Sequence, residues 1–108
     1  MPNDCTNHIT MTFPSDVKQA IESDIAQIKG EITQSGPYGI RFHYTSAWVP
    51  DYDWLNDMTT KYPHCWIKNE WISEDGTAGV WLWRNNNVKS MQWDDLSIEH
   101  EHYMFNTT

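Results

Sequence analysis

The fold is decided by residues 8–30, which read HITMTFPSDVKQAIESDIAQIKG. The first six residues alternate between polar and apolar side chains, which is typical of a half-buried strand. Pro14 ends this strand, and Ser15 can cap the helix that follows. Apolar residues then recur at helical spacing, at Val17, Ile21, Ile25 and Ile28. The stretch therefore predicts a strand that runs directly into an amphipathic helix.

The remainder of the chain predicts one more helix and several more strands. The expected strands are residues 31–34, 39–45, 65–72, 80–84 and 88–93, and the second helix opens at Pro50 and Asp51 and ends at Pro63. These strands are rich in aromatic and β-branched residues or alternate with a period of two. The three asparagines at residues 85–87 tolerate positive φ, so they suit the turn of a hairpin.

The order strand, helix, strand, strand, helix, strand predicts a ferredoxin-like βαββαβ sandwich. The expected fold class is therefore α+β, with an extra C-terminal strand or hairpin. Residues 1–108 form a single domain, of which residues 94–108 are an acidic and apolar tail. Both helices must cover one face of the sheet, which leaves the other face open. The expected core consists of Ile9, Met11, Phe13, Val17, Ile21, Ile25, Ile40, Phe42, Leu55 and Met58.

Composition limits the location and the partners. The chain has 15 acidic and 7 basic residues and a formal net charge of −8, so most of its surface should repel nucleic-acid phosphates. No apolar run approaches the roughly 20 residues of a membrane span, and the opening residues lack the features of a signal peptide. We therefore expect a cytoplasmic protein without nucleic-acid or membrane partners, in which Cys5 and Cys65 are free thiols.

The open face of the sheet is the candidate binding site. Alternation places His8, Thr10 and Thr12 on this face, beside Arg41, His43 and Thr45. Trp81 and Trp83 also share one face of their strand, and exposed aromatic residues can mark an interaction surface. The candidate binding residues are His8, Arg41, His43, Thr45, Trp81 and Trp83. A solvated polar surface or a dimer interface explains the same pattern, and the sequence favours this simpler interpretation.

No metal, cofactor or catalytic residue is expected. His100 and His102 are spaced so that both could face one side of a strand and reach a cation. Zinc sites normally have three or four ligands, however, and exposed histidines near a chain end are common. His8 and His43 could act as acid or base, but no nucleophile accompanies them.

Two motifs resemble the YubB-type ferredoxin-like family of small phage and plasmid proteins. The first reads Met1-Pro2-Asn3-x-Cys5-x-Asn7, and the second reads Phe42-x-x-Thr45-x-Ala47-Trp48-x-Pro50 followed by Lys61-Tyr62-Pro63. The resemblance implies a ferredoxin-like fold and a mobile-element origin, and it implies no catalytic residues. Within the second motif we expect Trp48 to be buried, plugging the joint between the sheet and the second helix, in preference to the alternative that it contacts a ligand.

Two functions remain open from the sequence. The first is a non-enzymatic protein-binding domain of phage or mobile-element origin, which the acidity, the aromatic content and the resemblance favour. The alternative is a small-ligand-binding or enzymatic dimer that uses the open sheet face. The expected partner is another protein or a second copy of the chain. For a second copy we expect a homodimer that buries the open face, residues 94–108 or both, because twofold pairing is the commonest way to bury such a face. The alternative for residues 94–108 is that they fold back as one more strand of their own domain.

Overall fold

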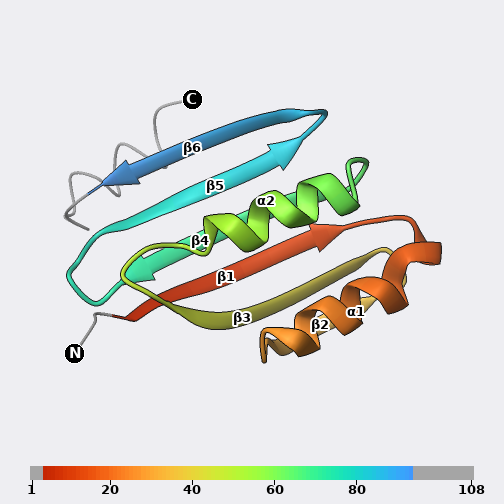
Figure 1. Ribbon diagram of the computed structural model, residues 1–108, viewed down its shortest axis with the longest axis horizontal. Coiled ribbons are helices and arrows are strands. Elements are labelled where there is room, and N and C mark those ends of the chain that lie inside the picture. Colours follow the sequence, from red (N-terminus) through yellow and green to blue (C-terminus); the bar gives the residue numbers. More distant parts are fainter. Residues whose placement is uncertain (1–3, 94–108) are drawn as a thin grey trace.

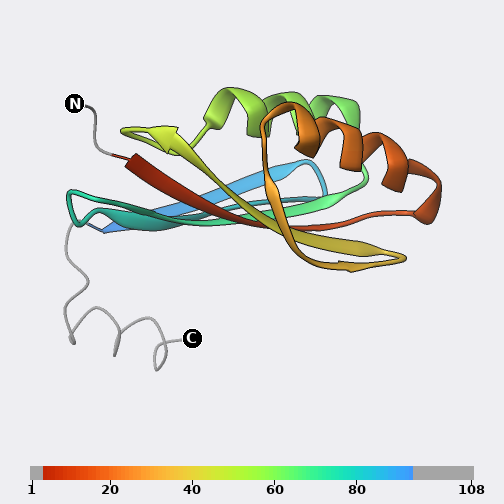
Figure 2. The same cartoon turned by 90° about the horizontal axis from the view of Figure 1, so that it is seen from below.

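A computed structural model describes residues 4–93 of the chain, as one sheet with helices on one side (Figure 1). The elements in chain order are β1 (Asp4–Thr12), a short 3-10 turn η1 (Ser15–Val17), α1 (Lys18–Gln27), β2 (Glu31–Gly36), β3 (Gly39–Ala47), α2 (Tyr52–Lys61), β4 (Trp66–Ser73), β5 (Ala78–Arg84) and β6 (Asn87–Trp93). Figure 2 shows both helices on the same face of the sheet.

The six strands pair antiparallel in the order β2-β3-β1-β4-β5-β6. The first four strands in this order and the two helices make the ferredoxin-like arrangement, and β5 and β6 extend it as a hairpin. The expected α+β fold class is therefore confirmed. β1 lies inside the sheet, where Ile9 pairs with Phe42 of β3 on one side and with Asn69 of β4 on the other.

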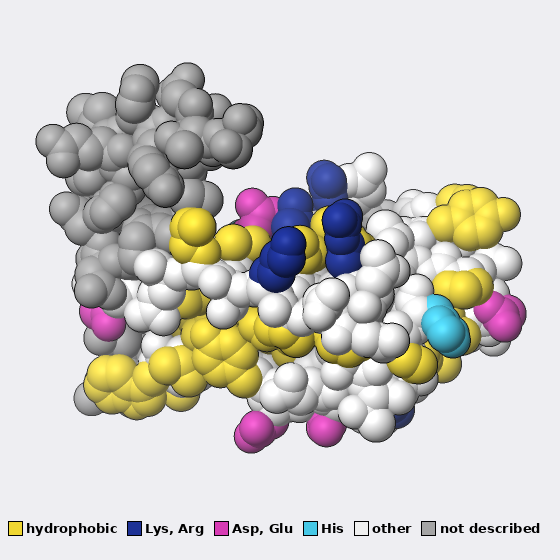
Figure 3. All heavy atoms as spheres, turned by 90° about the horizontal axis from the view of Figure 1, so that it is seen from above, with side chains coloured by type: hydrophobic (Ala, Val, Ile, Leu, Met, Phe, Trp, Pro, Cys, Tyr) yellow, Lys and Arg dark blue, Asp and Glu magenta, His cyan; other side chains and the backbone are white. Residues whose placement is uncertain are grey.

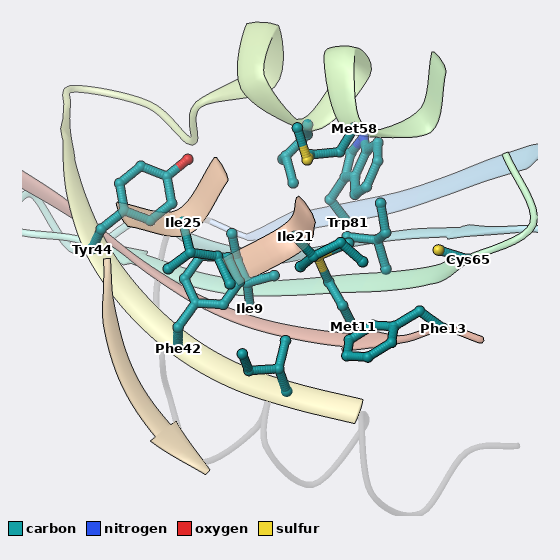
Figure 4. Close-up of a cluster of buried hydrophobic side chains, with 13 residues drawn as sticks. Ile9, Met11, Phe13, Ile21, Ile25, Phe42, Tyr44, Met58, Cys65 and Trp81 are labelled. Carbon is teal, nitrogen blue, oxygen red and sulfur yellow. The ribbon is translucent and has the colours of Figure 1, made fainter. Parts of the chain in front are cut away.

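The core lies between the helices and the sheet (Figure 4). The expected core residues are confirmed, except that Val17 is only partly buried against the cluster. The core cluster also contains four residues that were not expected there, Tyr44, Cys65, Ile67 and Trp81. Figure 4 shows Trp81 close to Met58 beneath α2. Both cysteines are buried free thiols, and burial raises the pKa of each.

Local residues explain where the elements begin and end. The Asp51 carboxylate accepts a hydrogen bond of 3.2 Å from the Trp54 backbone N–H, so Asp51 is the N-cap of α2. Asn85 and Asn86 have φ values of 51° and 63°, which is the backbone that a two-residue turn between β5 and β6 requires. The hairpin expected from the three asparagines is thus confirmed.

One buried carboxylate ties the two helices together. Asp24 of α1 is 6% exposed, and its Oδ1 lies 2.8 Å from the Lys61 Nζ. The Tyr62 hydroxyl donates a hydrogen bond of 2.7 Å to the other oxygen of the same carboxylate. Because this charge has two donors, its burial is compensated.

Candidate binding surfaces

The open face brings three of the predicted residues together. His8, Arg41 and His43 line one shallow hollow of about 220 Å³. Its other polar wall residues are Thr10, Thr33 and Glu70. The grouping arises because His8 pairs with His43 of β3 and with Glu70 of β4, so all three lie on one rung of the sheet.

A positively charged side chain, Arg41, and a negatively charged one, Glu70, both line the hollow. The two imidazole rings of His8 and His43 have centroids 6.0 Å apart, and the His43 Nε2 lies 3.5 Å from the Glu31 carboxylate. This geometry could hold a small polar ligand. Arg41, two threonine hydroxyls and the Glu70 carboxylate accompany the histidines, and the Thr33 hydroxyl donates its hydrogen bond to the Arg41 carbonyl instead of to a histidine.

The other predicted site residues lie elsewhere. Thr45 pairs with Thr6 on the next rung of the open face and does not line the hollow. The expected position of Trp81 and Trp83 on the open face is wrong. They pair with Asn69 and Ile67, whose side chains face the helices, so both tryptophans belong to the core side.

Basic residues gather on the open face. Arg41 and Lys68 both pair with Thr10, and Leu82 pairs with Lys68 and Lys89, which places three cations on one rung. Arg84 lies on the next rung of β5, on the same face as Leu82. We call Arg41, Lys68, Arg84 and Lys89 the basic row; Figure 3 shows Lys and Arg side chains grouped on the upper side of the molecule.

The basic row comprises four of the seven Lys and Arg residues of the chain. The net charge of −8 was the reason to expect no nucleic-acid partner, and a net charge does not show that cations gather on one face. The sequence does not reveal the clustering, because it arises from the pairing registers of four different strands.

The connection between β3 and α2 forms a second surface, and here the expectation for Trp48 is wrong. Trp48 is 56% exposed and does not plug the joint. Its φ is 69°, and the Val49 N–H donates to the Ala47 carbonyl at 2.8 Å, which makes Trp48 the centre of a left-handed γ-turn. This conformation is rare and strained for a bulky residue.

A chain of hydrogen bonds from the core fixes this turn. Asn69 donates to the Asn7 side-chain carbonyl at 2.9 Å, and Asn7 in turn donates to the Ser46 hydroxyl at 2.9 Å. Ser46 then donates to the Val49 carbonyl at 2.6 Å. Because both asparagines are 0% exposed, the strained turn is held by rigid, buried groups.

Trp48, Val49 and Tyr52 form an exposed apolar surface that we call the Trp48 corner. Acidic residues surround it. Asp51 and Asp53 line a shallow hollow with Val49 and Tyr52, and Asp4 pairs with Ala47 next to Trp48. Glu74 lies beside Asp4, since its backbone N–H donates to the Asp4 carbonyl. The corner therefore has an apolar centre and a negative rim.

The two histidines considered as metal ligands lie outside the described residues. His100 and His102 lie beyond residue 93, so the structure does not describe their arrangement. Between residues 4 and 93, no group of three or more His, Cys, Asp or Glu side chains has the arrangement of a metal site. Neither helix in that range is long and apolar enough to cross a membrane.

The observed fold agrees with the family that the sequence matches. The chain is a ferredoxin-like α+β domain. Over residues 28–108 it matches the family described as the ferredoxin-like domain in Api92-like protein, and since the match covers most of the chain, the chain belongs to this family. This description gives a fold and no activity. Neither a curated protein nor a solved structure matches the chain.

Proposed function

We propose that this chain is a non-enzymatic protein-binding domain and that the Trp48 corner engages its partner. The observation that carries the proposal is the exposed Trp48 in a left-handed γ-turn. Strained backbone persists where the surroundings enforce it, and it is commonest at functional positions. Tryptophan and tyrosine are also the residues most enriched among those that dominate binding energy at interfaces.

The rim predicts the chemistry of the partner. Asp4, Asp51, Asp53 and Glu74 surround the apolar centre with negative charge. A complementary surface would present an apolar pocket for Trp48 that is bordered by Lys or Arg side chains. We therefore infer a basic protein surface as the partner, and association should weaken with increasing salt because Asp4, Asp53 and Glu74 of the rim are exposed.

The origin and location of the chain are part of the same proposal. The motif around Trp48 lies inside the matched region and is one of the two that resemble YubB-type proteins. A phage or plasmid origin and a cytoplasmic location fit this likeness and the two free thiols. Genes of phage or plasmid proteins next to the coding sequence would support the origin.

The proposal is tested with one variant and a matched control. Immobilised wild-type chain, Trp48→Gly and Tyr38→Ser are used to capture proteins from a bacterial lysate, and the captured protein is then purified and titrated by calorimetry. Tyr38 is 65% exposed in the turn between β2 and β3, so it controls for loss of an exposed aromatic side chain. We expect Trp48→Gly to weaken binding at least tenfold, about 1.4 kcal/mol, and Tyr38→Ser to leave it unchanged. Equal binding by all three proteins would contradict the proposal.

The open face supports a second candidate function. Its hollow brings His8, His43 and Arg41 together with the Glu70 carboxylate, and the Glu31 carboxylate lies beside His43. This arrangement suits a small polar ligand or the interface of a homodimer. Light scattering of the full chain at tens of micromolar tests the dimer, since a specific interface of standard size is populated at that concentration. A monomer would exclude the dimer. A dimer that persists in His8→Ala plus His43→Ala would place its interface away from the hollow.

A further inference from the structure

We propose that the basic row of the open face is covered by the acidic C-terminal segment of the same chain, residues 94–108. This inference concerns the face opposite the helices and does not depend on the Trp48 corner. The chain is strongly acidic, yet four of its seven cationic side chains lie together on one face.

Charge identifies the segment as a suitable occupant. Residues 94–108 carry four carboxylates, at Asp94, Asp95, Glu99 and Glu101, and contain no Lys or Arg. Three of the four cations in the basic row have no carboxylate partner among residues 4–93. Lys68 already has a carboxylate partner, Glu70, at 3.1 Å, whereas Arg84 and Lys89 make no ion pair within residues 4–93. These two cations lie on β5 and β6, the strands nearest to the start of the segment.

Apolar groups of the two surfaces also match. The open face carries aliphatic side chains beside the cations, and Ile72 and Met91 there are 41% and 46% exposed. The segment is apolar as well as acidic, with Leu96, Ile98, Tyr103, Met104 and Phe105. Contact between these groups would remove apolar surface from water at about 25 cal/mol per Å², which adds to the charge attraction.

Residues 94–108 begin close to the basic row, because they follow β6 directly. β6 ends at Trp93, which pairs with Ala78, and Lys89 lies four residues earlier on the same strand. A strand advances about 3.3 Å per residue, so a segment that turns back needs only about four or five residues to reach Lys89. Such a short loop makes the effective concentration of the segment at the face high.

Hydrogen exchange measured by mass spectrometry on the full chain tests the inference. At low salt we expect the amides of residues 94–108 to exchange at least tenfold more slowly than in Arg84→Gln plus Lys89→Gln. The matched control is Lys18→Gln plus Lys29→Gln, which removes the same charge at the start and end of α1 and should leave the exchange of the segment unchanged. Neutralising the segment, with Asp94→Asn, Asp95→Asn, Glu99→Gln and Glu101→Gln, should abolish its protection as well.

Three results would overturn the inference. The first is exchange of the wild-type segment at the rate of an unstructured peptide. The second is protection that the Arg84 and Lys89 substitutions do not reduce, since the segment would then contact another surface. The third is protection that disappears on dilution, because the segment would then cover the face of a second copy.

Discussion

The Asn69 side-chain amide donates a hydrogen bond of 2.9 Å to the Asn7 side-chain carbonyl across β1 and β4, and both residues are completely buried. The pair is not directly opposite in the sheet, because Asn7 pairs with Trp71 and Asn69 pairs with Ile9. Sliding β4 along β1 would separate the two amides inside an apolar core. The pair therefore helps to set the register of the two central strands.

We predict that this pair is energetically coupled. Asn7→Ala should reduce the free energy of unfolding by about 1–3 kcal/mol, because the Asn69 amide is left buried without its partner. The double variant Asn7→Ala plus Asn69→Ala should cost less than the sum of the single variants. Urea denaturation of the four proteins measures the coupling, and Asn56→Ala, an exposed asparagine of α2, is the control. Additive costs, within about 0.5 kcal/mol, would argue against the coupling.

The buried apolar face of α1 gives a second prediction. Ile21 of α1 is 0% exposed and lies in the core cluster. Ile21→Ala should therefore reduce the free energy of unfolding by about 2–5 kcal/mol through lost burial and a residual cavity. Gln19→Ala, on the exposed face of the same helix, should change it by less than about 0.5 kcal/mol. A small effect at Ile21 would mean that α1 packs loosely on the sheet.

The hydrogen bond between Tyr62 and Asp24 predicts that the stability of the protein depends on pH. Burial, followed by the hydrogen bond to Asp24 and its charge, raises the pKa of Tyr62 to about 12. The fold thus favours the protonated phenol over the phenolate. This contribution to stability is complete below the ordinary tyrosine pKa of about 10 and is lost as the pH rises from there through about 12.

Two measurements check this prediction. The tyrosine absorbance of the folded protein should include one phenol that titrates near pH 12, and Asp24→Asn should lower the pKa of that phenol. In urea, Tyr62→Phe should lose less stability between pH 10 and pH 12 than the wild type does. The exposed-site variant Tyr38→Phe should follow the wild type, and identical pH curves for all three proteins would refute the assignment.

Backbone strain at Trp48 gives a fourth prediction. A left-handed conformation costs a non-glycine residue about 1–2 kcal/mol, and glycine avoids this cost. Trp48→Gly should therefore be more stable than Trp48→Ala by about 1 kcal/mol, the reverse of the usual order for the two residues. Chemical denaturation of both variants gives the comparison. If the alanine variant were the more stable, the turn would not be strained in solution.

Much of the fold could be predicted from local patterns. The alternation of residues 8–13 and 39–45 correctly identified which side chains of β1 and β3 face the helices. In β4 and β5 the same reasoning could not assign the faces. Asn69 interrupts the apolar series of β4, and the face of Trp81 depends on the register that the turn between the strands imposes. Local sequence does not determine that register.

The candidate sites were less predictable because they combine distant strands. His8, His43 and Arg41 could be grouped, since both of their strands alternate cleanly. Glu31, Thr33 and Glu70 were missed, because their strands alternate weakly or contain a register shift. Trp48 was assigned to the core from its size alone, while its left-handed backbone depends on a hydrogen bond between its two neighbours.

The interior position of β1 affects how the chain can fold during synthesis. β1 is synthesised before both of its partners, β3 and β4, which follow after intervening helices. The strand therefore emerges with an apolar face and two unpaired edges, and it has no neighbour until residue 39 has been made. Synthesis adds about 5–20 residues per second, so β1 must remain exposed for seconds before it can pair. One face of the unpaired strand is nevertheless polar, because it carries Thr6, Thr10 and Thr12.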